Sequence, residues 1–249
     1  MSASVNTLLG GHQRPNYWNN LGLWSAAQDY DSACCALAQA HAQAIALSAQ
    51  DRLIDLACGS GASLLFWQQH YGLSHSVGLD KTTPKRSKST QLVRGHFDRL
   101  PLPTALNNQR FDAAICIDAA YHAQSIEAFL KTAQALLVNH GRLVFSTIVS
   151  PDNNSAKRLD LRLAGIPNAS QISYRELNQA LATDWSNTEV LSLDTVFTGF
   201  AEHVAKREKE LTWVQKLSPA WLKIQATASL CERMLSANFD YVLISAQRR

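Results

Sequence analysis

Two glycines and two acidic residues form the pattern in this sequence with the clearest chemical meaning. Gly59 and Gly61 follow the apolar run Arg52–Leu56, which contains Asp55, and a second acid, Asp80, comes about 20 residues later. Glycine lets a backbone turn sharply and lets a ligand approach without a Cβ in the way. A strand, a glycine loop and a helix N-terminus together make a pocket for a nucleotide. A carboxylate at Asp80 can accept hydrogen bonds from both hydroxyls of a ribose.

The elements around these residues must bring them to one edge of a sheet. The pattern predicts a buried strand before the loop, a helix over Ala62–His70 and a second short strand over Ser76–Leu79. In an open α/β sheet, ligands bind outside the carboxyl ends of the strands. Asp98 and Asp118 stand at the ends of later segments, so we expect them to converge with the glycine loop on one crevice.

The glycine spacing distinguishes between nucleotide types. The dinucleotide fingerprint G-x-G-x-x-G needs a third glycine, but Leu64 stands in its place, which disfavours a dehydrogenase. The run Asp55-Leu-Ala-Cys-Gly-Ser-Gly61 instead resembles the first motif of the class I S-adenosylmethionine (SAM) methyltransferases. In that family the loop carries the amino-acid end of SAM, and Ala57 replaces the commoner first glycine by another small residue.

Four further segments resemble the later motifs of this family, in its order and with its usual spacing over residues 50–150. They are Val77–Asp80, Gly95–Asp98 followed by Leu100–Pro103, Phe111–Asp118 and Leu136–Phe145. The resemblance implies that Asp80 binds the ribose and that Asp98 faces the adenine amino group, while Asp55 either contacts SAM or holds the loop by hydrogen bonds to backbone N–H groups. The implied cofactor site comprises Asp55, Ala57, Cys58, Gly59, Ser60, Gly61, Asp80, Lys81, Phe97, Asp98, Asp118 and Tyr17.

The segment Asp118-Ala-Ala-Tyr-His122 lies where the acceptor sits in this family. It lacks the [DNS]-P-P-[YFW] motif typical of methylases of DNA amines and protein glutamines. With the aromatic N-terminus, it resembles the small-molecule methyltransferases of the tocopherol, sterol, geranyl diphosphate and natural-product type. The implied substrate-side residues are Tyr121, His122 and Trp24. His122 is the candidate general base because an imidazole titrates near neutrality, although a purely structural histidine fits equally.

The whole pattern predicts an α/β fold: a Rossmann-like, seven-stranded, mostly parallel sheet with helices on both faces and helical lid elements at the N-terminus and before the last strand. We expect one methyltransferase domain over 1–249, with an N-terminal flap and helix (1–49), a SAM-binding core (50–150) and a substrate-side half (151–249) containing a helical insertion over about 200–237. Residues 1–16 are expected to be mobile. Further predicted helices are Tyr30–Leu47, Ser125–Asn139 stopped by Gly141, Ser155–Ala164 and a capping-box helix from Ser173 to Thr183. Further predicted strands are Arg142–Val149, Thr188–Asp194 and Phe239–Ala246.

Several aromatic and basic residues have two interpretations. Tyr17, Trp18 and Trp24 form either a flap over SAM or part of the core. Trp213 and Trp221 are expected to form the packing core of the insertion, or, if some of these residues line the pocket, to indicate an apolar or aromatic acceptor. The basic run from Lys81 to Lys88 is either a solvated loop or a site for an anionic group on the acceptor.

Composition limits the remaining classes. The 249 residues are 46% hydrophobic, which allows a sizeable core, and the net charge of +3 does not indicate a nucleic-acid surface. Five scattered cysteines fit free thiols in a reducing compartment. We therefore expect a cytoplasmic monomer or homodimer with no metal and no stable membrane insertion, acting on a small-molecule acceptor. The alternatives are an RNA or protein methyltransferase, a SAM-binding protein without catalysis, and a cyclopropane-forming enzyme acting on membrane lipid.

Overall fold

A central sheet organises the chain in the computed structural model, which describes residues 3–12, 16–82, 91–151, 161–162 and 165–249. The strands are β1 (Arg52–Leu56), β2 (His75–Asp80), β3 (Leu92–Arg94), β4 (Phe111–Cys116), β5 (Leu137–Ser150), β6 (Ile172–Ser173), β7 (Trp185–Ser192) and β8 (Asp240–Arg248). Their order is β3-β2-β1-β4-β5-β8-β7, with β6 paired to β5. Only the pairings of β8 with β5 and β7 are antiparallel among the described strands. The predicted mostly parallel α/β sheet is confirmed, with the two-residue β6 as an addition.

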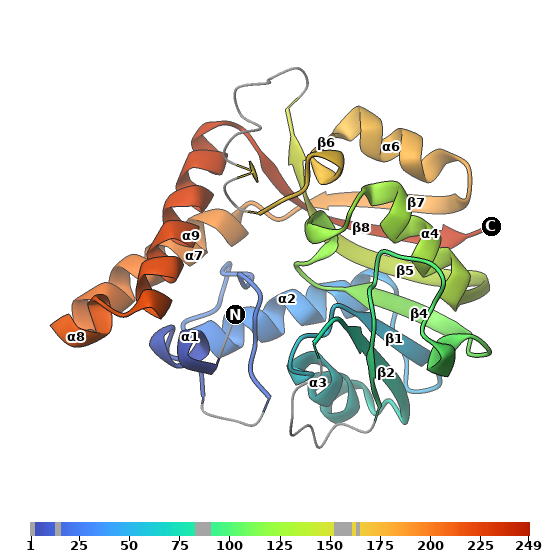
Figure 1. Ribbon diagram of the computed structural model, residues 1–249, viewed down its shortest axis with the longest axis horizontal. Coiled ribbons are helices and arrows are strands. Elements are labelled where there is room, and N and C mark those ends of the chain that lie inside the picture. The colour runs from blue at the N-terminus through green and yellow to red at the C-terminus, as the bar shows by residue number, and fades with distance from the viewer. Residues whose placement is uncertain (1–2, 13–15, 83–90, 152–160, 163–164) are drawn as a thin grey trace.

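Helices cover both faces of this sheet (Figure 1). They are α1 (Ala3–Leu8), α2 (Tyr30–Ala44), α3 (Ala62–Tyr71), α4 (Ile126–Leu136), α6 (Tyr174–Ala182), α7 (Thr195–Glu210), α8 (Trp213–Lys216) and α9 (Pro219–Ser236). Short 3₁₀ turns occur at Thr104–Leu106, Ala120–His122 and Asn168–Ser170. One buried apolar cluster joins the sheet to α1, α2, α3, α7 and α9, and the other joins it to α4 and α6. The inner strands are therefore buried on both faces, which explains their nearly continuous apolar sequences.

Local signals set several boundaries as the sequence predicts. Ser173 and Glu176 form the expected capping box at the start of α6, and the Ser125 side chain caps α4. The helical insertion is confirmed as α7, α8 and α9, although it begins at Thr195, before the predicted boundary.

The prediction for Ser125–Asn139 is wrong at its C-terminal end. Helix α4 ends at Leu136, and β5 begins at Leu137, which pairs with Phe111 of β4. Gly141 therefore lies inside a strand and does not end the helix; His140 has the positive φ of 62° nearby. Pairing with the adjacent strand β4 prevails over the helical periodicity.

The prediction that residues 1–16 are mobile is wrong for residues 3–9. Ala3–Leu8 forms α1, whose Val5 is buried together with Leu9, and α1 packs against α9 from the other end of the chain. Local sequence does not reveal this partner. Trp213 is also exposed instead of forming the packing core, whereas Trp221 is buried as predicted.

Two predictions fall on parts of the chain that the structure does not describe. The predicted helix Ser155–Ala164 lies almost wholly outside the described residues, and so does the basic run after Thr82. Within the described ranges, we find no helix that combines the length and apolarity required to cross a bilayer.

Candidate active site

The strand order places the predicted site residues at one edge of the sheet. β1 and β4 are neighbours, but the chain proceeds from β1 outward to β2 and β3, and from β4 in the opposite direction to β5. Such a reversal opens a crevice at the carboxyl ends of the strands. The glycine loop follows β1, Asp80 ends β2, Asp98 follows β3 and Asp118 follows β4.

The loop after β1 depends on left-handed backbone conformations. Ala57, Gly59 and Gly61 have φ values of 62°, 57° and 83°. A Cβ on Gly59 would lie 3.1 Å from the Asn19 side chain, and one on Gly61 would lie 3.3 Å from Asn16. The backbone conformation thus favours glycine at both positions, and a Cβ there would also crowd the two asparagine side chains. Ala57 adopts the same conformation at a cost of about 1 kcal/mol, at the position where glycine is commoner.

Asp80 fixes the loop to the end of β2. Its Oδ2 accepts a hydrogen bond from the Gly59 backbone N–H at 3.0 Å, and its Oδ1 accepts two from Thr82, from the backbone and the hydroxyl, at 2.8 Å each. The acid and the glycine loop that the sequence pairs are therefore in direct contact. Lys81 follows with an exposed side chain.

Residues 16–24, which we call the N-terminal strap, lie across the glycine loop. The Asn16 amide donates to the Gly61 carbonyl at 3.1 Å. Ser60 Oγ accepts from the Tyr17 backbone N–H at 2.8 Å and donates to the Tyr17 carbonyl at 2.6 Å. Trp18 packs edge-on against Phe66 of α3, with the ring centroids 6.0 Å apart. Because Tyr17 is held through its backbone, any residue except proline can make the same contacts at this position.

Two strap asparagines carry unused hydrogen-bond acceptors beside the loop. The Oδ1 atoms of Asn16 and Asn19 are buried and have no partner among the described residues. A buried amide oxygen without a donor is costly, so such atoms are normally satisfied. Two neutral acceptors beside a glycine loop suit an ammonium group, which the amino-acid end of SAM carries. The sequence analysis missed both residues; their signal is the Asn-x-x-Asn spacing within an aromatic segment.

Asp55 lies beneath the loop and is buried. Its carboxylate accepts a hydrogen bond from the Trp67 indole at 2.9 Å, which fixes α3 against β1. Burial raises the pKa of Asp55 to about 6, and hydrogen bonds from Ser63 and Trp67 oppose that rise. Burial also raises the pKa of the Cys58 thiol well above its ordinary value, so Cys58 is a neutral packing residue at physiological pH.

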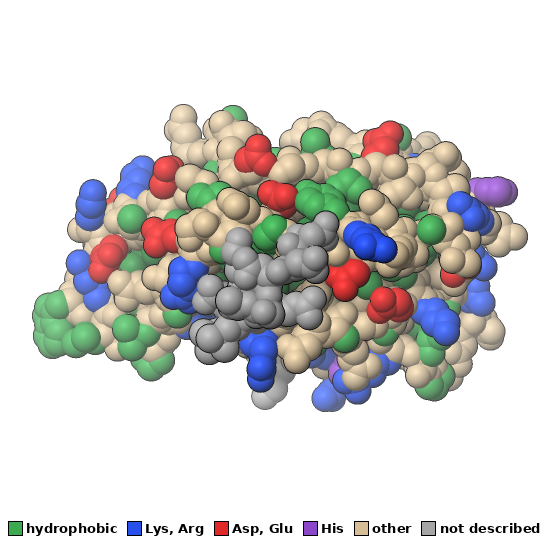
Figure 2. Space-filling view, turned by 90° about the horizontal axis from the view of Figure 1, so that it is seen from above, with side chains coloured by type: hydrophobic (Ala, Val, Ile, Leu, Met, Phe, Trp, Pro, Cys, Tyr) green, Lys and Arg blue, Asp and Glu red, His purple; other side chains and the backbone are tan. Residues whose placement is uncertain are grey.

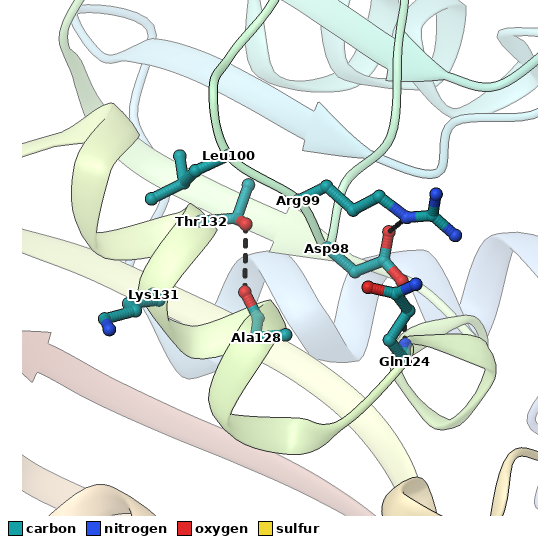
Figure 3. A pocket seen from close by; sticks show the side chains of 7 residues that line it. All are labelled: Asp98, Arg99, Leu100, Gln124, Ala128, Lys131 and Thr132. Carbon is teal, nitrogen blue, oxygen red and sulfur yellow. Dashed lines mark hydrogen bonds and ion pairs between the residues drawn. The ribbon is translucent and has the colours of Figure 1, made fainter.

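A pocket of about 420 Å³ opens beside Asp98. Figure 3 shows Asp98, Arg99 and Gln124 grouped on one side, with Leu100, Lys131 and Thr132 on the other. The buried Asp98 accepts from the Gln124 backbone N–H at 2.7 Å, and Arg99 Nε lies 4.0 Å from its other oxygen. The preceding residue, Phe97, packs edge-on against Phe129. The lining residues of this pocket come from the Asp98 loop and the α4 region, and none of them belongs to the glycine loop.

Asp118 is the centre of a buried polar network at the end of β4. Its Oδ1 accepts from the hydroxyls of Tyr121 and Tyr241 at 2.6 and 2.8 Å, and its Oδ2 accepts from the Leu21 backbone N–H at 2.7 Å. Ser146 Oγ accepts from the Asp118 N–H and donates its own proton to the Tyr241 hydroxyl oxygen at 2.9 Å. Burial raises the pKa of Asp118 to about 6, opposed by its hydrogen bonds. Asp118 therefore joins the strap to β4, β5 and β8.

The substrate-side residues differ in how they are held. The buried Tyr121 directs its hydroxyl inward to Asp118, whereas the adjacent His122 is exposed, with its ring 4.5 Å from that of Tyr121. Neighbouring atoms still remove water from part of the imidazole, and this desolvation lowers the pKa of His122, while a hydrogen bond with the Gly165 backbone opposes the shift. Trp24 donates to the Leu21 carbonyl and lies 4.5 Å from the ring of His203 on α7. Trp24 thus contacts the lid helices, while His122 and Tyr121 adjoin the end of β4.

The network also contains residues that the sequence analysis missed. Tyr241 and Ser146 are separated by almost 100 residues, and each sits in a strand that reads as an ordinary apolar segment. Only the antiparallel pairing of β5 with β8 brings their side chains together. The sequence carries no short-range signal for this contact.

Comparison with known proteins is consistent with this geometry. Residues 26–243 match the family model described as a methyltransferase domain. Over 92 residues the chain is 30% identical to a tRNA U34 carboxymethyltransferase from Psychrobacter sp. (strain PRwf-1), a match that covers 35% of this chain and 26% of that protein. The chain thus spans about a quarter of the length of that curated relative.

Two solved structures resemble the whole chain. The cyclopropane synthase MmaA2 from Mycobacterium tuberculosis has a TM-score of 0.76 and 14% identity, with 99% of this chain and 94% of that chain covered. The geranyl diphosphate C-methyltransferase from Streptomyces coelicolor A3(2) has a TM-score of 0.69 and 14% identity, with 100% and 99% covered. At these identities the likeness shows a shared fold.

Proposed function

Because this chain belongs to the methyltransferase family whose domain model it matches, and that family uses SAM, we propose that it methylates a small apolar or aromatic molecule. The acceptor atom forms a bond to the methyl carbon as the S–CH₃ bond breaks in line, and the bonding electrons pass to sulfur. The products are the methylated acceptor and S-adenosylhomocysteine, and the acceptor loses a proton. SAM brings an activated methyl group, so holding the two reactants in line supplies much of the rate.

The cofactor site that we propose follows from the contacts around the glycine loop. The amino-acid end of SAM would lie beside Gly59 and Gly61, and its ammonium would donate to the free amide oxygens of Asn16 and Asn19. Asp80 would bind the ribose. Asp55 and Asp118 would support this site. The remaining proposed cofactor contacts are Tyr17, Ala57, Cys58, Ser60, Lys81, Phe97 and Asp98.

The observation that carries the proposed acceptor class is the group of aromatic side chains packed around the end of β4. Phe197 of α7 contacts the Tyr241 ring edge-on at 5.7 Å, and Tyr241 shares Asp118 with Tyr121. Trp24 of the strap packs against α7. Aromatic groups from α7, β8, the 3₁₀ turn after β4 and the strap favour an apolar or aromatic acceptor that is shielded from water. One sheet that contains both the first strand β1 and the last strand β8 supports a single domain over residues 1–249.

We assign proton removal from the acceptor to His122. The lowered pKa keeps this imidazole neutral at pH 7, the form that accepts a proton. The expected result is that His122→Ala lowers kcat about 100-fold and changes the Kd for S-adenosylhomocysteine by less than about twofold. The assay is transfer of labelled methyl from SAM in a screen of apolar, aromatic and isoprenoid acceptors. Full turnover by the variant would remove His122 from the mechanism.

An RNA acceptor is the second candidate, because a local match to a tRNA-modifying enzyme favours it. The small net charge of +3 gives it little support, since RNA-binding surfaces are usually strongly basic. Bulk tRNA belongs in the same acceptor screen. Labelling of tRNA without labelling of any small molecule would replace the proposed acceptor class.

A further inference from the structure

The most exposed apolar side chains of the described chain include a group at the end of the lid. Trp213, Val214, Leu217 and Leu222 are 74%, 59%, 67% and 53% exposed, and we call them the apolar tip. Figure 1 shows α8 at the end of an arm formed by α7 and α9, well away from the sheet. Figure 2 shows hydrophobic side chains gathered at that same end of the molecule. A contiguous exposed apolar group usually marks an interaction site.

Local structure holds these side chains outward. The Thr212 hydroxyl and the Gln215 side chain form a capping box that starts α8, and Ser218 caps α9, whose first residue is Pro219. Trp221 is fully buried beside the exposed Leu222, so α9 presents two distinct faces. The apolar tip is therefore a second apolar surface, separate from the one that α9 buries in the arm.

The charge around the apolar tip is positive. Between residues 206 and 223 there are five basic and two acidic side chains, a net charge of +3 that equals the net charge of the whole protein. The basic residues are Lys206, Arg207, Lys209, Lys216 and Lys223, and the acidic residues are Glu208 and Glu210. Glu210 pairs with Arg207, and Glu208 accepts a hydrogen bond from Gln225. Across the part of the chain that the structure describes, no ion pair engages Lys209, Lys216 or Lys223.

We infer that the apolar tip docks on a membrane surface that contains anionic lipids. Tryptophan prefers the interface between headgroups and hydrocarbon, where Trp213 would sit with Val214 and Leu217 below it. Lys209, Lys216 and Lys223 would lie at headgroup level and attract acidic lipids. A projecting tip suits a deformable surface, whereas a folded protein would need a matching hollow. Docking of this kind needs no membrane-spanning helix.

This inference goes beyond the proposed methyl transfer and is tested without SAM or an acceptor. The full chain is sedimented with vesicles of phosphatidylcholine and phosphatidylglycerol at a ratio of roughly 3:1, and with vesicles of phosphatidylcholine alone. The expected affinity is at least about tenfold higher for the anionic vesicles, and it falls as salt is raised. Equal binding to both vesicles, or no binding to either, would overturn the inference.

Two variants and one matched control locate the contact. Trp213→Ser and Leu217→Ser should each reduce vesicle affinity about tenfold, because each removes an apolar side chain from the interface. Leu191→Ser is the control, since Leu191 is 57% exposed on β7, outside the arm, and should leave affinity within about twofold. Unchanged thermal unfolding would show that each variant is folded. An equal loss in all three variants, or a concentration-dependent dimer that Trp213→Ser abolishes, would assign the apolar tip another role.

Discussion

The pH dependence of stability gives a direct test of the buried Asp118 network. In the folded protein, Asp118 is removed from water, and its carboxylate has hydrogen bonds from Tyr121, Tyr241 and the Leu21 backbone. Burial raises its pKa from 3.8 to about 6 despite these contacts. Asp118→Asn substitutes a neutral side chain of the same shape, so the ionisation is removed while one carbonyl oxygen remains to accept hydrogen bonds.

The sign of the effect follows from which state holds the proton. Between pH 3.8 and about 6 the folded protein keeps the Asp118 proton that the unfolded chain has released, so raising the pH destabilises the fold. A shift of about two pH units at 1.36 kcal/mol each corresponds to about 3 kcal/mol. The free energy of unfolding of Asp118→Asn, relative to the natural protein, should therefore rise by about 3 kcal/mol from pH 4 to pH 7.

The assay is guanidinium unfolding of both proteins at several pH values. The contributions of the other titrating groups cancel when the two free energies of unfolding are subtracted. Asp112→Asn is the matched control, because hydrogen bonds from Arg52 lower the pKa of Asp112. A lowered pKa affects stability only below 3.8, where the unfolded carboxyl takes up a proton before the folded one, so the difference between Asp112→Asn and the natural protein should stay nearly constant from pH 4 to pH 7. A constant difference in unfolding free energy between Asp118→Asn and the natural protein from pH 4 to pH 7 would refute the argument that burial raises the pKa of Asp118.

Three further perturbations test one buried histidine of α2 and two contacts of the strap. Burial lowers the pKa of His41 to about 4, so stability should fall by about 3 kcal/mol as the pH drops from 6.5 to 4, and His41→Leu should flatten that loss in guanidinium unfolding. Ser60→Ala removes both bonds to Tyr17 and should raise the rate of proteolysis within the strap; an unchanged rate would contradict the strap contact. Gly199→Ala should lower stability by about 1–3 kcal/mol, because its Cβ would overlap Trp24 of the strap, and a thermal midpoint equal to that of the natural protein would contradict this packing.

Local signals made much of the site predictable. The glycine loop, the acid Asp80 and the capping box at Ser173 depend on backbone conformations or contacts that a few adjacent residues determine. Parallel sheet topology then implies that Asp98 and Asp118 come to the same edge. The positions of Asp98 and Asp118 at strand ends could therefore be predicted from their spacing in the sequence alone.

Long-range contacts were not predictable in the same way. The strap reaches Asp118 through the backbone N–H of Leu21, a group that every residue except proline has. The Asp118 hydrogen bond from Tyr241 joins residues 123 positions apart. Helix α1 likewise finds its partner, α9, across nearly the whole chain. Sequence patterns indicate which residues are buried, but they do not indicate which distant residues pack against them.

Calorimetric titration with S-adenosylhomocysteine tests the central claim most directly. The natural protein should bind with a Kd in the micromolar range, roughly −8 kcal/mol, and Asp80→Ala should abolish binding because it removes the acid at the glycine loop. Asp112→Ala, which removes an acid at the opposite end of the sheet, should bind as the natural protein does. Absence of binding by the natural protein, or equal binding by Asp80→Ala, would contradict the assignment of this crevice as the SAM site.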